Sequence, residues 1–229
     1  MTAPYKQPLH IGFMDADMLD LFHQMQPEDL PGYILYGGTA LAMYLNHRRS
    51  TDFDFFKPDS ISLEKIQNIP WLQGAKFTGK YGMIDAEIKK NHRTVKFNFV
   101  CIDSFNTERP KHPNRKAPPN NLIIAHPVDI LTGKIGAMST RQAYRDFYDI
   151  GAAYRQIPDD LNKAIIEHLK SPLTKEENPP DLAKSTICYP YEFEYGSPEP
   201  IVNAVNTLAE KLKKYATLGE FINHAEELE

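Results

Sequence analysis

The segment from residue 33 to residue 56 constrains the fold of this chain more strongly than any other. Its first four residues, 33 to 36, form an apolar run that predicts a short buried strand. Two glycines, Gly37 and Gly38, interrupt this run, and the apolar residues after them predict a helix with Thr39 as its N-cap. We therefore expect a strand and a helix joined by a glycine turn at the centre of the fold.

A second strand is predicted after a basic turn at residues 47–50. In this strand Asp52 and Asp54 alternate with Phe53 and Phe55. Residues two apart on a strand share a face, so both carboxylates are expected on one face and both phenyl rings on the other. This is the arrangement of a metal site that stands on an apolar core.

The chemistry of the two predicted elements points to a nucleotide. Gly37 and Gly38 allow the backbone to approach a bulky anion, and the helix after them directs its N–H groups and positive dipole end toward that anion. Asp52 and Asp54, roughly 6–7 Å apart along a strand, can lean toward two divalent ions about 3.5–4 Å apart. A glycine pair alone is usually a turn, and an acidic pair alone is usually solvated surface. Only their combination favours a nucleoside triphosphate with Mg²⁺ or Mn²⁺.

The same segment resembles a known family. Its pattern, GGTALAxxLxHRxSxDxDxF, is similar to the first two motifs of nucleotidyltransferase-superfamily proteins of the AbiEii type, the toxins of abortive-infection toxin–antitoxin pairs. The matching residues are Gly37, Gly38, Thr39, Ala40, Leu41, Ala42, His47, Arg48, Ser50, Asp52, Asp54 and Phe56. The resemblance implies that Asp52 and Asp54 bind the metal ions. It also implies that nucleotide is bound by Gly37, Gly38, Thr39, Arg48 and Ser50.

The third motif of the family departs from the pattern here. Relatives that have this motif carry an aspartate that completes a carboxylate triad, and the strand predicted over residues 94–102 has Asn98 in that position. An asparagine can bind a metal ion through its carbonyl oxygen but adds no negative charge, so metal affinity should fall. Asp85 and Glu87 on the preceding predicted strand are possible substitutes, although such residues usually form a solvated face.

A fourth motif is expected within residues 126–150. The spacing of apolar residues predicts two helices there, with Thr140 as the cap of the second. The resemblance implies that Lys134 binds the charge of the triphosphate and that Asp146 supports the site. The alternatives are an ordinary surface lysine and an ion pair between helices.

The remaining periodicity predicts an α/β (α+β) fold with a helical C-terminal region. The resemblance implies that helices flank a mixed sheet of the nucleotidyltransferase type. We expect an α/β core over residues 1–103, a basic, proline-rich loop over 104–121, and a mainly helical region over 122–229 that completes the cleft. In the loop, Arg109, Lys111, Arg115 and Lys116 either hold an anionic partner or merely solvate the connection. The expected elements include an opening amphipathic helix over 14–25, strands over 75–78 and 83–88, and helices over 159–169, 200–215 and 218–228.

Composition favours a protein of the cytoplasm. The hydrophobic content of 41% over 229 residues is enough for a core, and a net charge of −4 excludes a globally basic nucleic-acid binder. No apolar run is long enough to span a membrane, no export signal opens the sequence, and Cys101 and Cys188 follow no metal-binding or disulfide pattern.

The glycine turn and the paired carboxylates predict a bound nucleoside triphosphate, and the resemblance implies a nucleotidyltransferase that moves a nucleoside monophosphate from it to an RNA or protein hydroxyl. The resemblance implies a tRNA or a protein as acceptor and a cognate antitoxin as partner. One alternative is a binding protein on the same fold, weakened as an enzyme by Asn98. A phosphatase with an aspartyl nucleophile is disfavoured, because a basic turn rather than a long apolar strand precedes Asp52.

Overall fold

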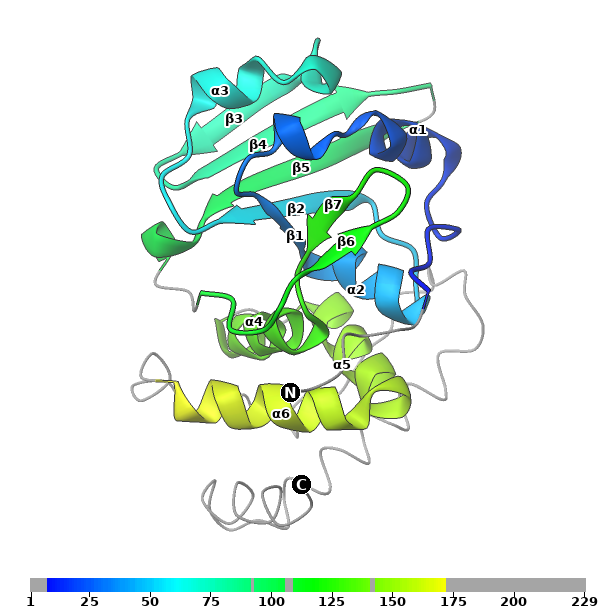
Figure 1. Cartoon of the computed structure of the whole chain (residues 1–229), viewed down its shortest axis with the longest axis vertical. Helices are drawn as coiled ribbons and strands as arrows, with labels where there is room; N and C mark the ends of the chain where they lie inside the picture. Colours follow the sequence, from blue (N-terminus) through cyan, green and yellow to red (C-terminus); the bar gives the residue numbers. More distant parts are fainter. Residues whose placement is uncertain (1–7, 92, 106–108, 141–142, 172–229) are drawn as a thin grey trace. The chain divides into compact units, whose positions relative to one another are not determined.

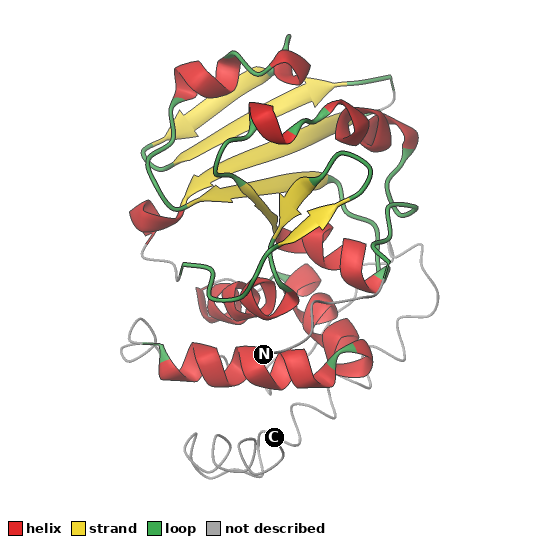
Figure 2. Ribbon diagram, viewed as in Figure 1, coloured by secondary structure: helices red, strands yellow, loops and turns green. Residues whose placement is uncertain are grey.

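The computed structural model describes residues 8–91, 93–105, 109–140 and 143–171. The chain divides into two compact units after His126, and each unit is described by itself (Figure 1). The first unit carries every strand of the described residues, and the helices α4 to α6 belong to the second (Figure 2).

A seven-stranded mixed sheet, in the order β3-β4-β5-β2-β1-β7-β6, forms the centre of the first unit. The central strand β2 pairs parallel with β5 and antiparallel with β1, and β1 pairs parallel with β7. The strands are β1 (Ile34–Tyr36), β2 (Asp52–Lys57), β3 (Lys76–Lys80), β4 (Met83–Lys89), β5 (Thr94–Cys101), β6 (Arg115–Ala117) and β7 (Leu122–Ile124). The predicted α/β fold with a mixed sheet is confirmed.

Stacked aromatic rings fill the core on one face of this sheet. Phe53 of β2 lies 5.4 Å from Phe97 of β5, and Phe55 lies 5.6 Å from Phe99, both pairs with nearly parallel rings. Trp71, in the short 3-10 helix η2 (Pro70–Leu72), packs 5.2 Å from Phe97. The four phenylalanines are at most 1% exposed, so the alternation in the sequence predicted the core face of β2 and β5 correctly.

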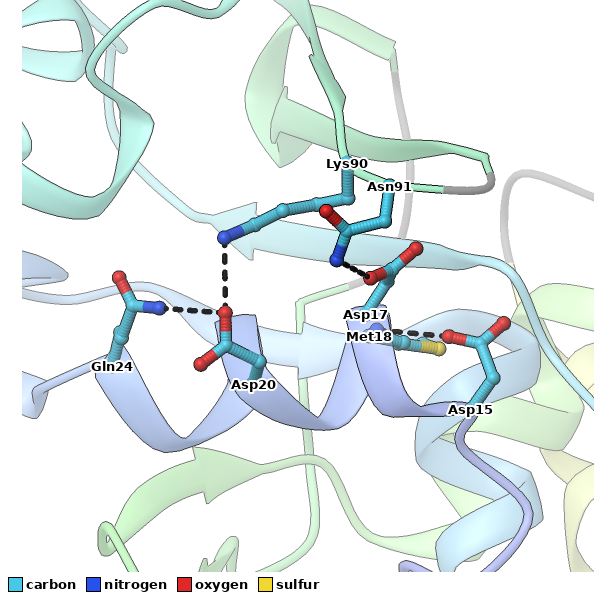
Figure 3. Close-up of polar contacts among 7 residues, drawn as sticks. All are labelled: Asp15, Asp17, Met18, Asp20, Gln24, Lys90 and Asn91. Carbon is cyan, nitrogen blue, oxygen red and sulfur yellow. Dashed lines mark hydrogen bonds and ion pairs between the residues drawn. The ribbon is translucent and has the colours of Figure 1, made fainter.

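Helix α1 (Ala16–Gln24) lies on the same aromatic face, where Phe22 stacks on Phe53 at 6.3 Å. Figure 3 shows the polar contacts that hold this helix to the turn after β4: Lys90 donates to Asp20 at 2.9 Å, and Asn91 donates to Asp17 at 3.1 Å. The hydrogen bond from Lys90 lowers the pKa of the Asp20 carboxyl. The buried residues of this region, Met14, Met18, Leu21, Phe22 and Met25, confirm the predicted amphipathic helix.

Helix α2 (Gly37–Leu45) begins two residues earlier than predicted. Its N-cap is Tyr36, and Thr39 lies fully buried in the first turn, where its hydroxyl donates to the backbone carbonyl of Asp52. The assignment of Thr39 as N-cap was therefore wrong. The helix ends at Asn46, which adopts the left-handed conformation that commonly terminates helices.

Part of the segment interpreted as a basic loop is a strand. Arg115–Ala117 form β6, which pairs antiparallel with β7 at the edge of the sheet. The interpretation of 104–121 as a loop throughout was therefore wrong. The other short elements of the first unit are η1 (Pro27–Asp29), α3 (Leu63–Gln67) and η3 (Ile102–Phe105).

The second unit contains helices α4 (Pro127–Thr140), α5 (Tyr144–Gln156) and α6 (Pro158–Lys170), which pack on one another. Thr140 is the last residue of α4, and the N-cap of α5 is Ala143, so the predicted cap at Thr140 was wrong. The helices predicted over 200–215 and 218–228 lie outside the described residues. Among the helices described, none combines the length and the apolar character needed to cross a membrane.

Candidate active site

The two predicted metal ligands, Asp52 and Asp54, lie on the face of β2 opposite to the aromatic core. Both aspartates are partly exposed, whereas Phe53, which lies between them, and Phe55, which follows Asp54, are buried. The Thr51 hydroxyl donates to Asp52 Oδ1 at 3.0 Å. The carboxylates thus share one face, as the alternation predicted.

Asn98 joins this acidic face from β5. It is the direct partner of Asp54 in the parallel pairing of β2 and β5, and its side-chain Nδ2 donates to Asp54 Oδ1 at 2.7 Å. Hydrogen bonds to a carboxylate stabilise its charged form. Asn98 therefore holds Asp54 in place and adds no charge of its own.

Gly37 is required by the position of Asp54. A Cβ atom built on Gly37 would lie 2.7 Å from Asp54 Cγ and would overlap Oδ2, and the φ angle of Gly37 is +70°. Both the close approach and the positive φ favour glycine. The carboxylate of Asp54 is thereby placed against the first residue of α2.

Gly38 makes room for Arg48 in the same way. A Cβ atom on Gly38 would lie 3.2 Å from Arg48 Cζ and would overlap Nη2. Arg48 is only 5% exposed, and its Nη1 donates to the backbone carbonyl of Arg49 at 2.9 Å. The guanidinium, a permanent positive charge, therefore lies against the first turn of α2.

The turn that supplies Arg48 is largely buried. His47 and Ser50 are 6% and 8% exposed, and among residues 47–50 only Arg49 is exposed. Two of the three basic residues of this turn, His47 and Arg48, are thus buried, which the charge of the turn alone does not predict. Thr39, Arg48 and Ser50 all lie within the first unit, around the start of α2 and β2.

Asp85 and Glu87, the possible substitutes for a third carboxylate, differ in their surroundings. Asp85 is the direct partner of Asn98 in the antiparallel pairing of β4 and β5. Glu87 pairs instead with Lys96, whose Nζ lies 3.5 Å from Glu87 Oε1 in a half-exposed ion pair. Of the two, Asp85 lies in the row of Asn98 and Asp54.

Lys134 and Asp146 come together in the second unit. Lys134 Nζ lies 3.0 Å from Asp146 Oδ1 and 2.6 Å from Asp149 Oδ2, and the three side chains are 9%, 3% and 0% exposed. One lysine of α4 thus faces two buried carboxylates of α5. The predicted contact with a triphosphate stays a prediction, and the alternative of an ion pair between helices describes what the structure contains.

The comparison with protein families decides the class of this chain. Residues 20–187 match the family described as "Nucleotidyl transferase AbiEii toxin, Type IV TA system". The chain belongs to the AbiEii family. The match includes both the acidic face of the first unit and the Lys134 cluster of the second.

Individual relatives of this AbiEii-family protein are distant. An uncharacterized protein of Aquifex aeolicus (strain VF5) is 32% identical over 140 residues, which span 57% of this chain and 62% of that protein. A solved structure described as a "putative nucleotidyltransferase from H. pylori" has a TM-score of 0.54 and 17% identity, and the alignment covers 94% of this chain and 99% of that one. It shows the fold. The MenT4 nucleotidyltransferase toxin of Mycobacterium tuberculosis H37Rv has a TM-score of 0.42 and 18% identity, with 59% of this chain and 56% of that one covered.

Asp149 is a member of the Lys134 cluster that the prediction of site residues omitted. A signal for it exists in the sequence, because Asp146 and Asp149 are three residues apart and therefore lie on the same side of a helix. The two buried carboxylates require a cation, and Lys134 supplies it.

A cavity of about 310 Å³ lies elsewhere in the first unit of this AbiEii-family protein. Tyr33 and Phe55 contribute to its wall, and Phe55 lies on the face of the sheet opposite to Asp54. The lining contains none of the predicted site residues. The candidate active site is therefore the acidic face, and this cavity is separate from it.

Proposed function

We propose that this protein transfers a nucleoside monophosphate from a nucleoside triphosphate to a hydroxyl group of RNA or protein. Membership of a nucleotidyltransferase toxin family supports the class of reaction. The observation that carries the proposal is the position of Asp54, whose carboxylate lies against Gly37 at the start of α2, on the face shared with Asp52. A helix N-terminus favours phosphate and paired carboxylates favour a divalent cation, so the two features suit a metal-bound nucleotide.

The donors present fit Mg²⁺ or Mn²⁺. Asp52 and Asp54 offer hard oxygen ligands and are partly exposed, so a hydrated ion can reach them. Asn98 turns its Nδ2 toward Asp54, and its amide must rotate to offer the carbonyl oxygen instead. We therefore assign the metal to Asp52 and Asp54, with Asn98 as a neutral third ligand. When bound, the metal would offset the charge that develops on the phosphates.

Residues at the start of α2 would bind and orient the triphosphate. The first N–H groups of the helix and the Arg48 guanidinium both favour a negative charge there. Gly37 and Gly38 contribute by admitting Asp54 and Arg48, and Thr39 fixes the backbone of Asp52.

In the reaction, an acceptor hydroxyl oxygen bonds to the α-phosphorus. The bond from that phosphorus to the bridging oxygen breaks, pyrophosphate leaves with the electron pair, and the hydroxyl proton passes to solvent. The protein supplies positioning and charge rather than a covalent intermediate. A tRNA or a protein is the proposed acceptor, and a cognate antitoxin is the proposed partner.

Lys134 has two proposed roles in this scheme. It neutralises Asp146 and Asp149, with which it forms buried ion pairs. Binding to the triphosphate requires that it exchange one of these carboxylates for a phosphate oxygen. Asp146 would then position Lys134 and would not itself touch the nucleotide.

One observation favours the alternative, a binding protein on the nucleotidyltransferase fold. Asn98, where the family resemblance predicts a third carboxylate, adds no negative charge and donates to Asp54 Oδ1, so that this oxygen is less available to a cation. Such a protein would act through a partner and would not transfer nucleotide.

The test is a transfer assay with the full chain and each nucleoside triphosphate labelled at the α-phosphate. Total RNA and the protein itself serve as acceptors, with and without Mg²⁺. We expect Mg²⁺-dependent labelling that Asp52→Ala and Asp54→Ala abolish, while melting temperatures show that both variants fold. Glu64→Gln is the matched control, because Glu64 is exposed in the first turn of α3 and is none of the candidate site residues, so its loss should leave labelling unchanged.

Two outcomes would contradict the proposal. Full transfer by the Asp52→Ala or the Asp54→Ala variant would show that the replaced aspartate is not part of the site. No labelling by the wild-type protein, together with no stabilisation by nucleotide and Mg²⁺, would favour the binding protein, since a ligand that binds the native state raises the melting temperature.

A further inference from the structure

Two aromatic side chains, Tyr36 and Phe56, flank Asp54 on the acidic face of the sheet. Tyr36 is the direct partner of Asp54 in the antiparallel pairing of β1 and β2, and Phe56 is two residues after Asp54 on the same strand. Both positions place the side chain on the face of Asp54. The ring centroids are 4.9 Å apart, so the two rings form one contiguous pair.

This pair differs from the aromatic residues on the other face. Phe53 and Phe55 are at most 1% exposed, whereas Tyr36 and Phe56 are each only partly buried. The two residues therefore retain accessible surface. Aromatic faces stack on nucleobases with little dependence on base identity, because every base has a π-face.

The spacing relative to Asp54 suits a nucleotide. Directly paired residues on antiparallel strands have Cα atoms about 4.5–5.5 Å apart, and residues two apart on a strand are separated by roughly 6–7 Å. In a nucleotide, one sugar ring separates the base from the 5′-phosphate. This separation is similar to the distances from Asp54 to Tyr36 and to Phe56. Gly37, which directly follows Tyr36 in the chain, and Arg48 lie where the rest of the phosphate chain is proposed.

We propose that Tyr36 and Phe56 form a stacking platform for a nucleobase whose phosphate lies at Asp54. The inference rests on the proposed function and adds to it the contact that recognises the base. The base belongs either to the nucleoside triphosphate or to an acceptor RNA, and the chemistry of stacking is the same for both. Because stacking is tolerant of base identity, the platform would strengthen binding more than it would select among the four bases.

The experiment compares ligands with and without a base. Tyr36→Leu and Phe56→Leu in the full chain keep apolar bulk but remove the π-face. The dissociation constants of nucleoside triphosphates, of single-stranded RNA and of inorganic tripolyphosphate are measured with Mg²⁺ by calorimetry. We expect the leucine variants to bind the nucleoside triphosphates or the RNA about 5- to 150-fold more weakly, and to bind tripolyphosphate unchanged. The ligand whose affinity falls identifies the source of the base.

Matched controls separate stacking from folding. Tyr36→Phe and Phe56→Tyr keep a ring and should bind as wild type does. Tyr81→Leu removes an aromatic side chain that is 92% exposed, and should change no affinity.

Three outcomes would overturn the inference. If a folded protein with both Tyr36→Leu and Phe56→Leu bound nucleoside triphosphates and RNA as tightly as the wild type, the inference would be overturned. The proposed function would not be affected by that result. Equal losses for tripolyphosphate, which has no base, would also overturn the inference, because these would show a structural effect. A wild-type protein that binds neither nucleoside triphosphate nor tripolyphosphate would overturn the proposed function and the inference with it.

Discussion

Asn98 Nδ2 donates a 2.7 Å hydrogen bond to Asp54 Oδ1, across the parallel pairing of β5 and β2. The neutral amide thus occupies the place where the family resemblance predicts a third carboxylate. We therefore expect a change of charge at residue 98 to test whether Asp54 binds a metal ion.

Asn98→Asp should destabilise the metal-free protein near neutral pH by about 1–3 kcal/mol. The substitution removes the donor and places a second negative charge beside Asp54, so that two like charges repel each other. Urea unfolding with and without Mg²⁺ measures the effect, and Mg²⁺ should restore part of the loss. Asn98→Ala, which removes the donor without adding charge, is the control and should respond less to Mg²⁺. A stable Asn98→Asp protein that is insensitive to Mg²⁺ would contradict a metal site at Asp54.

Gly37→Ala should cost more stability than Gly38→Ala. The methyl group at Gly37 meets the short carboxylate of Asp54 at a positive φ angle, whereas the methyl group at Gly38 meets the far end of the flexible Arg48 side chain. We expect Gly37→Ala to lower the free energy of unfolding by roughly 3 kcal/mol or more, and Gly38→Ala to lower it by about 1–2 kcal/mol. Thermal or urea unfolding of both variants shows which of them loses more stability.

A double-mutant cycle tests the cause at Gly38. If the Arg48 guanidinium is the obstacle, Gly38→Ala should cost less stability in an Arg48→Ala background than in the wild type. Equal costs in both backgrounds would show that the backbone of α2 needs glycine for another reason.

Lys134→Met should destabilise the protein by about 3–5 kcal/mol, because it leaves the buried carboxylates of Asp146 and Asp149 without their shared cation. Lys96→Met is the control: its half-exposed ion pair with Glu87 should contribute less than about 1 kcal/mol. Chemical denaturation measures both. A folded Lys134→Met protein of nearly wild-type stability would instead favour a role for Lys134 in phosphate binding.

Tyr33 should make stability sensitive to alkaline pH. Burial raises the pKa of the Tyr33 phenol from 10.0 to about 12, with a smaller contribution from Cys101. Because the folded pKa lies above the unfolded value, the stabilisation from the neutral phenol is fully present below pH 10 and is lost as the pH rises toward 12. Tyr33→Phe should reduce the loss of stability between pH 10 and pH 12, as measured by denaturation at several pH values. Tyr81→Phe, at an exposed position, should not.

Periodicity in the sequence predicted the elements whose side chains alternate strongly. The phenylalanines of β2 and β5 and the apolar stripe of α1 are examples, because burial on one face requires a period that the sequence displays. Strand β6 escaped prediction, since three residues flanked by prolines and basic residues contain no such period.

The candidate site was predictable in its residue types but not in its contacts. The carboxylates of β2 could be placed on one face from alternation alone. The burial of Arg48 against Gly38, and the sharing of Lys134 by two carboxylates, depend on side chains brought together by tertiary packing. The cap at Thr39 was misplaced because a buried threonine near a helix start has the same sequence signature as an N-cap.

The position of β1 in the sheet has a consequence for folding during synthesis. Leu35 is flanked by Phe55 of β2, made soon afterwards, and by Ile124 of β7, made much later. The early strands can pair as soon as they leave the ribosome, but one edge of β1 stays uncovered until the chain has been extended past Ile124. Since an uncovered strand edge can pair with another chain, we expect nascent chains that stall before β7 to aggregate more readily than chains that stall after it.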